Sequence, residues 1–370
     1  MIERRSAVRA GLRPARAPRP GRALAALLFT LLGAGVVSAE DAVLARSRSA
    51  REGVLRKLEA TRPFLRGMTV SCAGNGREWG TEMMTGALRE LEPLGVEWIS
   101  IHPYARIERS GEVRFKKAAD SPYLAAAVQR VAAEKVGLFW LPHLAYWGSF
   151  EWRGAIEFGQ DQAAWRRFFD GYRDFIVDQA IFAEQHGVRL FAVGIEYDAT
   201  LEHEAEWRRI LAAVRAVYSG VVVYAANWDR VAAVPFWDAV DVIGVQAYFP
   251  LGAEPYPSRE AIEKGWQQPL AQLRELSGRF GKPVLFTEIG YDLAAQAARE
   301  PWLPATADTP ENRALRRRLI EAALAGLEKE PFLLGLFWWK WIPGRPAHDP
   351  DFKMEDGDAR ELLARYWAGR

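Results

Sequence analysis

One cysteine among 370 residues, Cys72, leaves the chain unable to form an internal disulfide, so the fold has to rely on core packing. Cys72 follows an apolar run at 68–71, which favours a buried small side chain over a reactive nucleophile. Histidine is also scarce, with five residues and no His-x-His pair, which argues against a metal hydrolase. We therefore expect no metal and no other cofactor.

Three signatures of common enzyme classes are missing as well. The sequence has no Gly-x-Ser-x-Gly elbow, no phosphate-binding loop, and no dinucleotide glycine fingerprint after its first expected strand. The acidic stretch 348–358 offers oxygen ligands that suit Ca²⁺. A solvated loop that leads into the N-cap of a last helix is the favoured interpretation of that stretch.

Positive charge is concentrated at the N-terminus. Residues 1–39 contain seven Arg and one acid, and the remaining 331 residues carry 42 basic and 46 acidic side chains, a net charge of −4. A mildly acidic body argues against nucleic acid as the partner. With 49% hydrophobic and 26% charged residues, the composition is that of an ordinary globular protein.

The N-terminal region has the pattern of a secretory signal peptide. Its Arg-rich start is followed by an uncharged apolar run at 23–37 and by small residues at 37–39. We expect residues 1–39 to be a signal peptide and 40–63 a helical lead-in. The mature chain is then secreted or periplasmic, with no membrane span after cleavage. Retention as an anchor is the alternative, but the run is shorter than the roughly 20 residues of a span.

After residue 60, short apolar runs alternate with segments of helical periodicity, such as 161–186, 204–218 and 309–330. Thr309 and Pro310 suit the N-cap and first turn of the last of these. Eight strands alternating with helices predict an α/β fold, a single-domain (β/α)8 TIM barrel over 64–370, which we expect to be a monomer. The expected strands are 65–71, 96–102, 137–144, 190–196, 221–226, 241–247, 283–288 and 333–339.

Polar and aromatic side chains follow the expected strands at the barrel end where active sites form. Glu196 ends the fourth strand and Glu288 the seventh, and these strands can face each other across the barrel mouth. An acid that ends an apolar strand is unusual unless it is paired or catalytic. Two such carboxylates are what glycoside hydrolysis requires, and structural ion pairs with a nearby Arg or Lys are the alternative.

Aromatic residues are abundant, with 15 Trp, 18 Phe and 11 Tyr. Flat rings beyond the needs of a core often line sites for sugars, although a large core also absorbs them. An oligosaccharide or polysaccharide is therefore the expected partner.

Six stretches, taken in order, resemble glycoside hydrolase family 113. The resemblance covers about 65–341 and implies a clan-A (β/α)8 retaining glycosidase, from a family whose characterised members are endo-β-1,4-mannanases. It implies that Glu196 is the general acid/base and Glu288 the nucleophile, with carboxyl groups about 5–5.5 Å apart. The stretches are 151–154, 191–196, 224–229, 236–251, 282–291 and 335–341.

The same resemblance suggests which side chains bind the sugar. Tyr248 ends the sixth strand and is expected to donate a hydrogen bond to Glu288. Trp338 or Trp339 is expected to form the floor beneath the reacting sugar, and one of the two must point away because side chains alternate along a strand. Further candidates for sugar contacts are His143, Trp152, Arg153, Asn227, Trp228 and Lys340.

Two of these candidates have structural alternatives. His143 follows Pro142 and can instead hydrogen-bond within the barrel. Arg153 can instead pair with Glu151 or Glu157.

One position departs from the clan pattern, which usually has a polar residue before the acid/base. Here that residue is Ile195, which cannot hydrogen-bond a sugar hydroxyl and leaves the identity of the glycan open. Another β-glycan, a cell-wall polysaccharide or an exopolysaccharide is an alternative substrate, and a non-catalytic carbohydrate-binding barrel is an alternative function. The loop 292–308, with Trp302, is expected to decide between endo and exo action.

Overall fold

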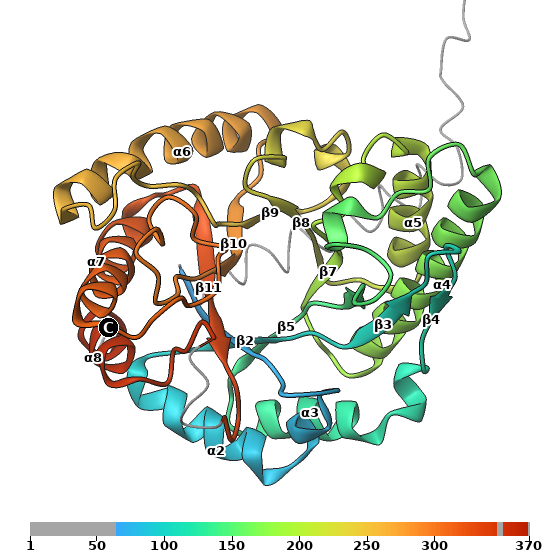
Figure 1. Ribbon diagram of the computed structural model, residues 1–370. Helices are drawn as coiled ribbons and strands as arrows, with labels where there is room; N and C mark the ends of the chain where they lie inside the picture. Colours follow the sequence, from blue (N-terminus) through green and yellow to red (C-terminus); the bar gives the residue numbers. More distant parts are fainter. Residues whose placement is uncertain (1–63, 346–350, 369–370) are drawn as a thin grey trace, which may run out of the picture. The chain divides into compact units, whose positions relative to one another are not determined.

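Eight parallel strands close into a barrel in the computed structural model, which describes residues 64–345 and 351–368 (Figure 1). This confirms the predicted (β/α)8 TIM barrel. The signal peptide and helical lead-in expected at 1–39 and 40–63 lie outside the described residues. Around the barrel the strands are β1 (Leu65–Val70), β11 (Leu333–Trp341), β10 (Val284–Ile289), β9 (Val242–Gln246), β8 (Val221–Asn227), β7 (Leu190–Ile195), β5 (Gly137–Trp140) and β2 (Trp98–Ile101).

The helices lie outside the ring of strands in Figure 1. Asp161 caps α4 by accepting hydrogen bonds from the backbone N–H groups of Ala163 and Ala164, and Thr309 caps α7 as expected. No α-helix joins β8 to β9 in the described chain, where two short 3-10 helices take its place. The α-helices are α2 (Glu82–Leu91), α3 (Pro122–Ala133), α4 (Gln162–Gln185), α5 (Glu204–Val217), α6 (Arg259–Phe280), α7 (Pro310–Gly326) and α8 (Gly357–Trp367).

The barrel strands are apolar because both of their faces are covered. Every residue of β7 and of β10 is buried. Along each strand the side chains point alternately into the barrel and outward toward the helices. Glu288 lies within β10, whereas β7 ends at Ile195 and Glu196 is the next residue. The strand ends therefore bring both carboxylates to the same end of the barrel.

The third expected strand, 137–144, is not continuous. β5 ends at Trp140, Pro142 interrupts the ladder because it has no N–H to donate, and β6 (His143–Ala145) begins a second sheet. In that sheet β6 pairs with β3 (Tyr104–Ile107), which also pairs with β4 (Val113–Arg114). His143 consequently belongs to this small sheet and not to a barrel strand.

Much of the aromatic content is core. The side chains of Trp207, Tyr224 and Phe236 pack together behind β7 and β8, with ring centroids 5.1–5.5 Å apart. Six tryptophans are almost completely buried, so the aromatic excess is only partly a feature of the site. Within the described residues, no helix has the length and apolarity needed to cross a membrane.

Candidate active site

The two carboxylates share one cavity of about 670 Å³ at the carboxyl ends of the strands. That volume is in the range of pockets that enclose most of a small ligand. Eight of the expected site residues line it: Glu196, Glu288, Tyr248, Asn227, Trp228, Trp152, Arg153 and Trp339. Trp302, from the loop expected to shape the site, also lines it, as do Tyr146, Glu151, Asp229 and Phe352, which were not among the predicted contacts.

Glu196 is held in an unusual backbone conformation. Its φ of 55° lies in the left-handed region, which non-glycine residues rarely adopt. Its backbone N–H donates to the Ala225 carbonyl of β8 at 2.9 Å, which ties the turn to the barrel. Such local strain persists where the surroundings fix it and is frequent at functional sites.

Arg153 lies beside Glu196 and contacts it with two nitrogens. Nη2 donates to Oε2 at 2.9 Å and Nε to the same oxygen at 3.3 Å, while the guanidinium lies 5.6 Å from the centre of the Tyr146 ring. The pairing with Glu151 or Glu157 considered from the sequence is therefore wrong. Burial lowers the pKa of Arg153, but the charges of Glu196 and Glu288 outweigh it and raise that pKa above its ordinary value.

Glu288 is almost fully buried, and Tyr248 donates its hydroxyl to Oε2 at 3.1 Å, as expected. Burial, and then the charge of Glu196, raise the pKa of Glu288 to about 7. Arg153, the Gln246 amide and the Tyr248 hydroxyl act in the opposite direction. Near neutral pH the free protein therefore has a proton available at this carboxylate.

With Glu288 as the nucleophile that the resemblance implies, Tyr248→Phe is expected to lower kcat by about 10- to 100-fold, because a hydrogen bond to a charged group contributes about 1.5–3 kcal/mol. The ring and its packing against Phe352 are kept, so KM should change less than kcat. Because Tyr248 lowers the pKa of Glu288, the acidic limb of the pH–rate profile should also move to higher pH. Steady-state kinetics over a pH series measures both effects. An unchanged kcat at every pH would contradict the role of the Tyr248 hydrogen bond in stabilising the Glu288 carboxylate.

His143 lies behind Glu288 and does not line the cavity. Its Nε2 is 3.9 Å from Glu288 Oε1, and its ring stacks on His102 with centroids 4.8 Å apart. Burial, with the charges of Arg153 and His102, holds the pKa of His143 well below its ordinary value, so the ring is neutral. Within the described chain neither ring nitrogen has a hydrogen-bond partner, so the internal hydrogen bond proposed as an alternative is absent.

Of the adjacent tryptophans, Trp339 lines the cavity and Trp338 does not. Trp338 is fully buried and lies 6.5 Å from the Tyr291 ring, as alternation along β11 requires for one of the pair. Lys340 does not line the cavity either, because its Nζ pairs with Asp351 Oδ2 at 2.5 Å. The structure therefore favours Trp339 as the floor of the site and removes Trp338 and Lys340 from it.

Cys72 does not line this cavity. Burial and the charge of Glu78 raise the pKa of the half-buried Cys72 thiol to about 11, so it is protonated at neutral pH. The described part of the chain brings no three His, Cys, Asp or Glu side chains together in a way that could hold a metal ion.

Two carboxylates at the mouth of a barrel, in an aromatic cavity, are the arrangement that glycoside hydrolysis uses. The sequence model of Glycoside Hydrolase Family 113 matches residues 68–355, and the chain belongs to this family. It is a glycoside hydrolase.

Solved structures agree with this assignment. The β-mannanase AaManA of Alicyclobacillus acidocaldarius, solved in complex with ManMIm, is 27% identical, with a TM-score of 0.70 over 82% of this chain and 97% of its own. A β-1,4-mannanase of the same family superposes with a TM-score of 0.72 at 21% identity, covering 83% of this chain and 99% of its own. No match to a curated protein was found.

Proposed function

We propose that the chain is a retaining β-glycosidase that hydrolyses β-1,4-mannan, with Glu196 as general acid/base and Glu288 as nucleophile. The observation that carries the proposal is the shared cavity, which both carboxylates line and in which Tyr248 donates a hydrogen bond to Glu288. The likeness to a β-mannanase at 27% identity supports mannan as the substrate.

The reaction takes place in two displacements. The Glu288 carboxylate attacks the anomeric carbon while Glu196 gives its proton to the departing glycosidic oxygen, which leaves as a hydroxyl. Glu196 then takes a proton from water, and the resulting hydroxide displaces Glu288 and restores the β-configuration. The proton that Glu196 receives replaces the one it gave, so both carboxyl groups return to their starting states.

The charges of the free site determine where the proton has to move. Arg153 pairs with Glu196, and burial favours the neutral form of Glu288, which is opposite to the arrangement that the first displacement needs. We propose that the sugar separates Arg153 from Glu196 as it binds, so that the proton passes to Glu196 and Glu288 becomes the nucleophile. Arg153 is placed to make this exchange because its guanidinium interacts electrostatically with both carboxylates.

Product release from a panel of β-glycans tests the substrate. Soluble β-1,4-mannan, β-1,4-glucan, β-1,4-xylan and a bacterial exopolysaccharide preparation are incubated with the mature protein and with Glu196→Ala and Glu288→Ala. Manno-oligosaccharides formed only by the wild type would support the proposal. Because Ile195 is fully buried and apolar, release from another glycan is the second outcome, and it would keep the carboxylates and overturn mannan.

Glu288→Gln is expected to stabilise the fold above neutral pH. A carboxyl group whose pKa is raised from 4.5 to about 7 binds its proton more tightly in the folded chain, so its contribution to stability is lost as the pH rises through about 7. At pH 8 the amide should raise the free energy of unfolding by on the order of 3 kcal/mol. Urea denaturation of the variant and the wild type at pH 8 and pH 4 measures this difference in the free energy of unfolding. The same difference at both pH values would contradict the raised pKa of Glu288 as its cause.

We also propose that residues 1–39 direct export and are removed, and that the mature protein is a monomer. N-terminal sequencing of the protein recovered outside the cytoplasm tests the first statement, with removal after Ala39 as the expected result. Light scattering of the purified mature chain tests the second.

A further inference from the structure

We propose that Trp302, supported by Trp228, forms a subsite for a neutral hexopyranosyl unit on the leaving-group side of the bond that is cleaved. This inference rests on the proposed function and adds to it a second sugar-binding position. Both tryptophans line the cavity that contains Glu196 and Glu288, so a sugar at this position would be continuous with the one that reacts.

The two indole rings come from different parts of the chain and lie nearly parallel. Their centroids are 5.8 Å apart and the planes differ by 15°. Trp228 is half-buried and packs on Phe249 at 6.0 Å, whereas 44% of the Trp302 surface is exposed. Trp302 thus offers a flat apolar face to the solvent, which is the surface that the apolar face of a pyranose ring covers.

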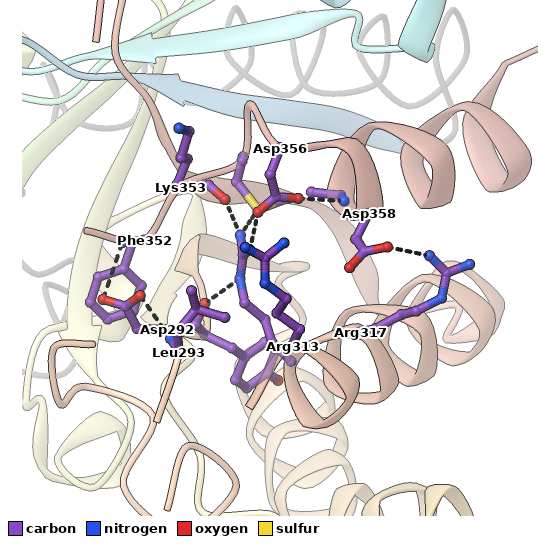
Figure 2. A network of polar contacts seen from close by, with 12 residues as sticks. Asp292, Leu293, Arg313, Arg317, Phe352, Lys353, Asp356 and Asp358 are labelled. Carbon is purple, nitrogen blue, oxygen red and sulfur yellow. Dashed lines mark hydrogen bonds and ion pairs between the residues drawn. The ribbon is translucent and has the colours of Figure 1, made fainter. Parts of the chain in front are cut away.

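The loop that carries Trp302 is firmly held. The buried Asp292 carboxylate accepts hydrogen bonds from the backbone N–H groups of Leu293 and Ala305, both at 2.8 Å. It also accepts one from Phe352 at 3.2 Å (Figure 2). One side chain therefore joins both ends of the loop to the segment that supplies Phe352 to the same cavity. A fixed loop presents its tryptophan without a large ordering cost when the ligand binds.

The position of Trp228 assigns the subsite to the leaving group. Trp228 directly follows β8, and β8 lies beside β7 and accepts the Glu196 backbone hydrogen bond through Ala225. Glu288 lies on β10, two strands further round the barrel. A general acid has to face the oxygen of the departing sugar, so the unit that leaves lies toward the Glu196 side and toward Trp228.

The charges around the cavity select a neutral sugar. Four carboxylates line it, at Glu151, Glu196, Asp229 and Glu288. Arg153 is the one cationic side chain among the described lining residues, so the acidic groups outnumber it. A uronic acid would bring a further negative charge into this field, whereas hydroxyl groups can donate to the exposed Asp229 carboxylate.

Trp302→Ala is compared with Trp302→Phe and with Trp147→Ala, which removes another exposed tryptophan that does not line the cavity. Kinetics are measured on β-1,4-mannohexaose and on β-mannobiosyl fluoride, whose leaving group is not a sugar. For Trp302→Ala we expect kcat/KM on mannohexaose to fall by about tenfold or more, as truncation of an aromatic anchor usually does. Hydrolysis of the fluoride should be unchanged, Trp302→Phe should be intermediate, and Trp147→Ala should behave as wild type.

Equal losses on both substrates, or no loss on mannohexaose, would overturn the subsite. Failure of the proposed function gives a different result, because the wild type would then hydrolyse neither substrate. In that case calorimetric binding of mannohexaose to the wild type and to Trp302→Ala decides the matter. Weaker binding by Trp302→Ala would support the subsite, and equal binding would overturn it.

Discussion

Glu288→Ala is expected to lower kcat by at least about 10⁴-fold, because removal of a nucleophile abolishes the covalent step that divides the reaction in two. The loss should appear on every glycan that the wild type cleaves. Substrate binding should remain, since the alanine leaves Trp339, Trp228 and Arg153 in the cavity. Reducing-end release with the purified variant measures the loss, and isothermal titration with the same glycan measures the binding.

Azide distinguishes the nucleophile from the other carboxylate. In Glu288→Ala a small anion can enter the vacated space and attack the anomeric carbon directly, so azide should restore turnover on an activated aryl glycoside and give the α-glycosyl azide. Glu157→Ala is a matched control, because Glu157 is exposed and does not line the cavity. A β-glycosyl azide from Glu288→Ala would show that this residue is the acid/base instead.

The strand ends explain why so much of the site could be predicted from the sequence. Parallel strands buried on both faces are apolar, so an acid next to such a run is conspicuous, and Glu196 and Glu288 both fit that description. Closure of the barrel brings the carboxyl ends of all eight strands together at one mouth, independently of the length and sequence of the loops. Asn227, Trp228 and Tyr248 could be placed in the cavity for the same reason.

Contacts between distant segments could not be predicted in this way. Phe352 lines the cavity because its carbonyl accepts from the Lys340 N–H at 2.9 Å and its own N–H donates to Asp292. From the sequence, the residues around Phe352 indicated only an acidic loop.

The partner of Arg153 could not be predicted either, because Glu196 is 43 residues away and Glu151 and Glu157 are close in the sequence. Likewise, alternation requires one of Trp338 and Trp339 to face inward, but only the register of β11 decides which.

Glu196→Ala is expected to lower kcat on a natural glycan by about 10²- to 10⁴-fold, the usual contribution of general acid–base catalysis. The loss depends on the leaving group. A sugar alkoxide needs a proton to depart, whereas an acidic phenol such as 2,4-dinitrophenol departs without one. With the dinitrophenyl glycoside, kcat/KM should therefore stay close to the wild-type value, while kcat falls because water still lacks its base in the second displacement. Stopped-flow and steady-state kinetics on the glycan and on the dinitrophenyl glycoside measure the effects on kcat and on kcat/KM separately.

The anomer of the glycosyl azide that Glu196→Ala forms shows which of the two carboxylates is the nucleophile. The charges of the free site alone do not decide between them. In Glu196→Ala the glycosyl-enzyme on Glu288 survives long enough for azide to attack from the side that water would use, so the β-glycosyl azide is expected. If Glu196 were the nucleophile, its pairing with Arg153 and the proton on Glu288 would already be in their working arrangement. Azide would then give the α-anomer with Glu196→Ala, and the loss would be as large on the dinitrophenyl glycoside as on the glycan. The β-anomer, with little loss of kcat/KM on that substrate, would mean that sugar binding exchanges the proton between the two carboxylates.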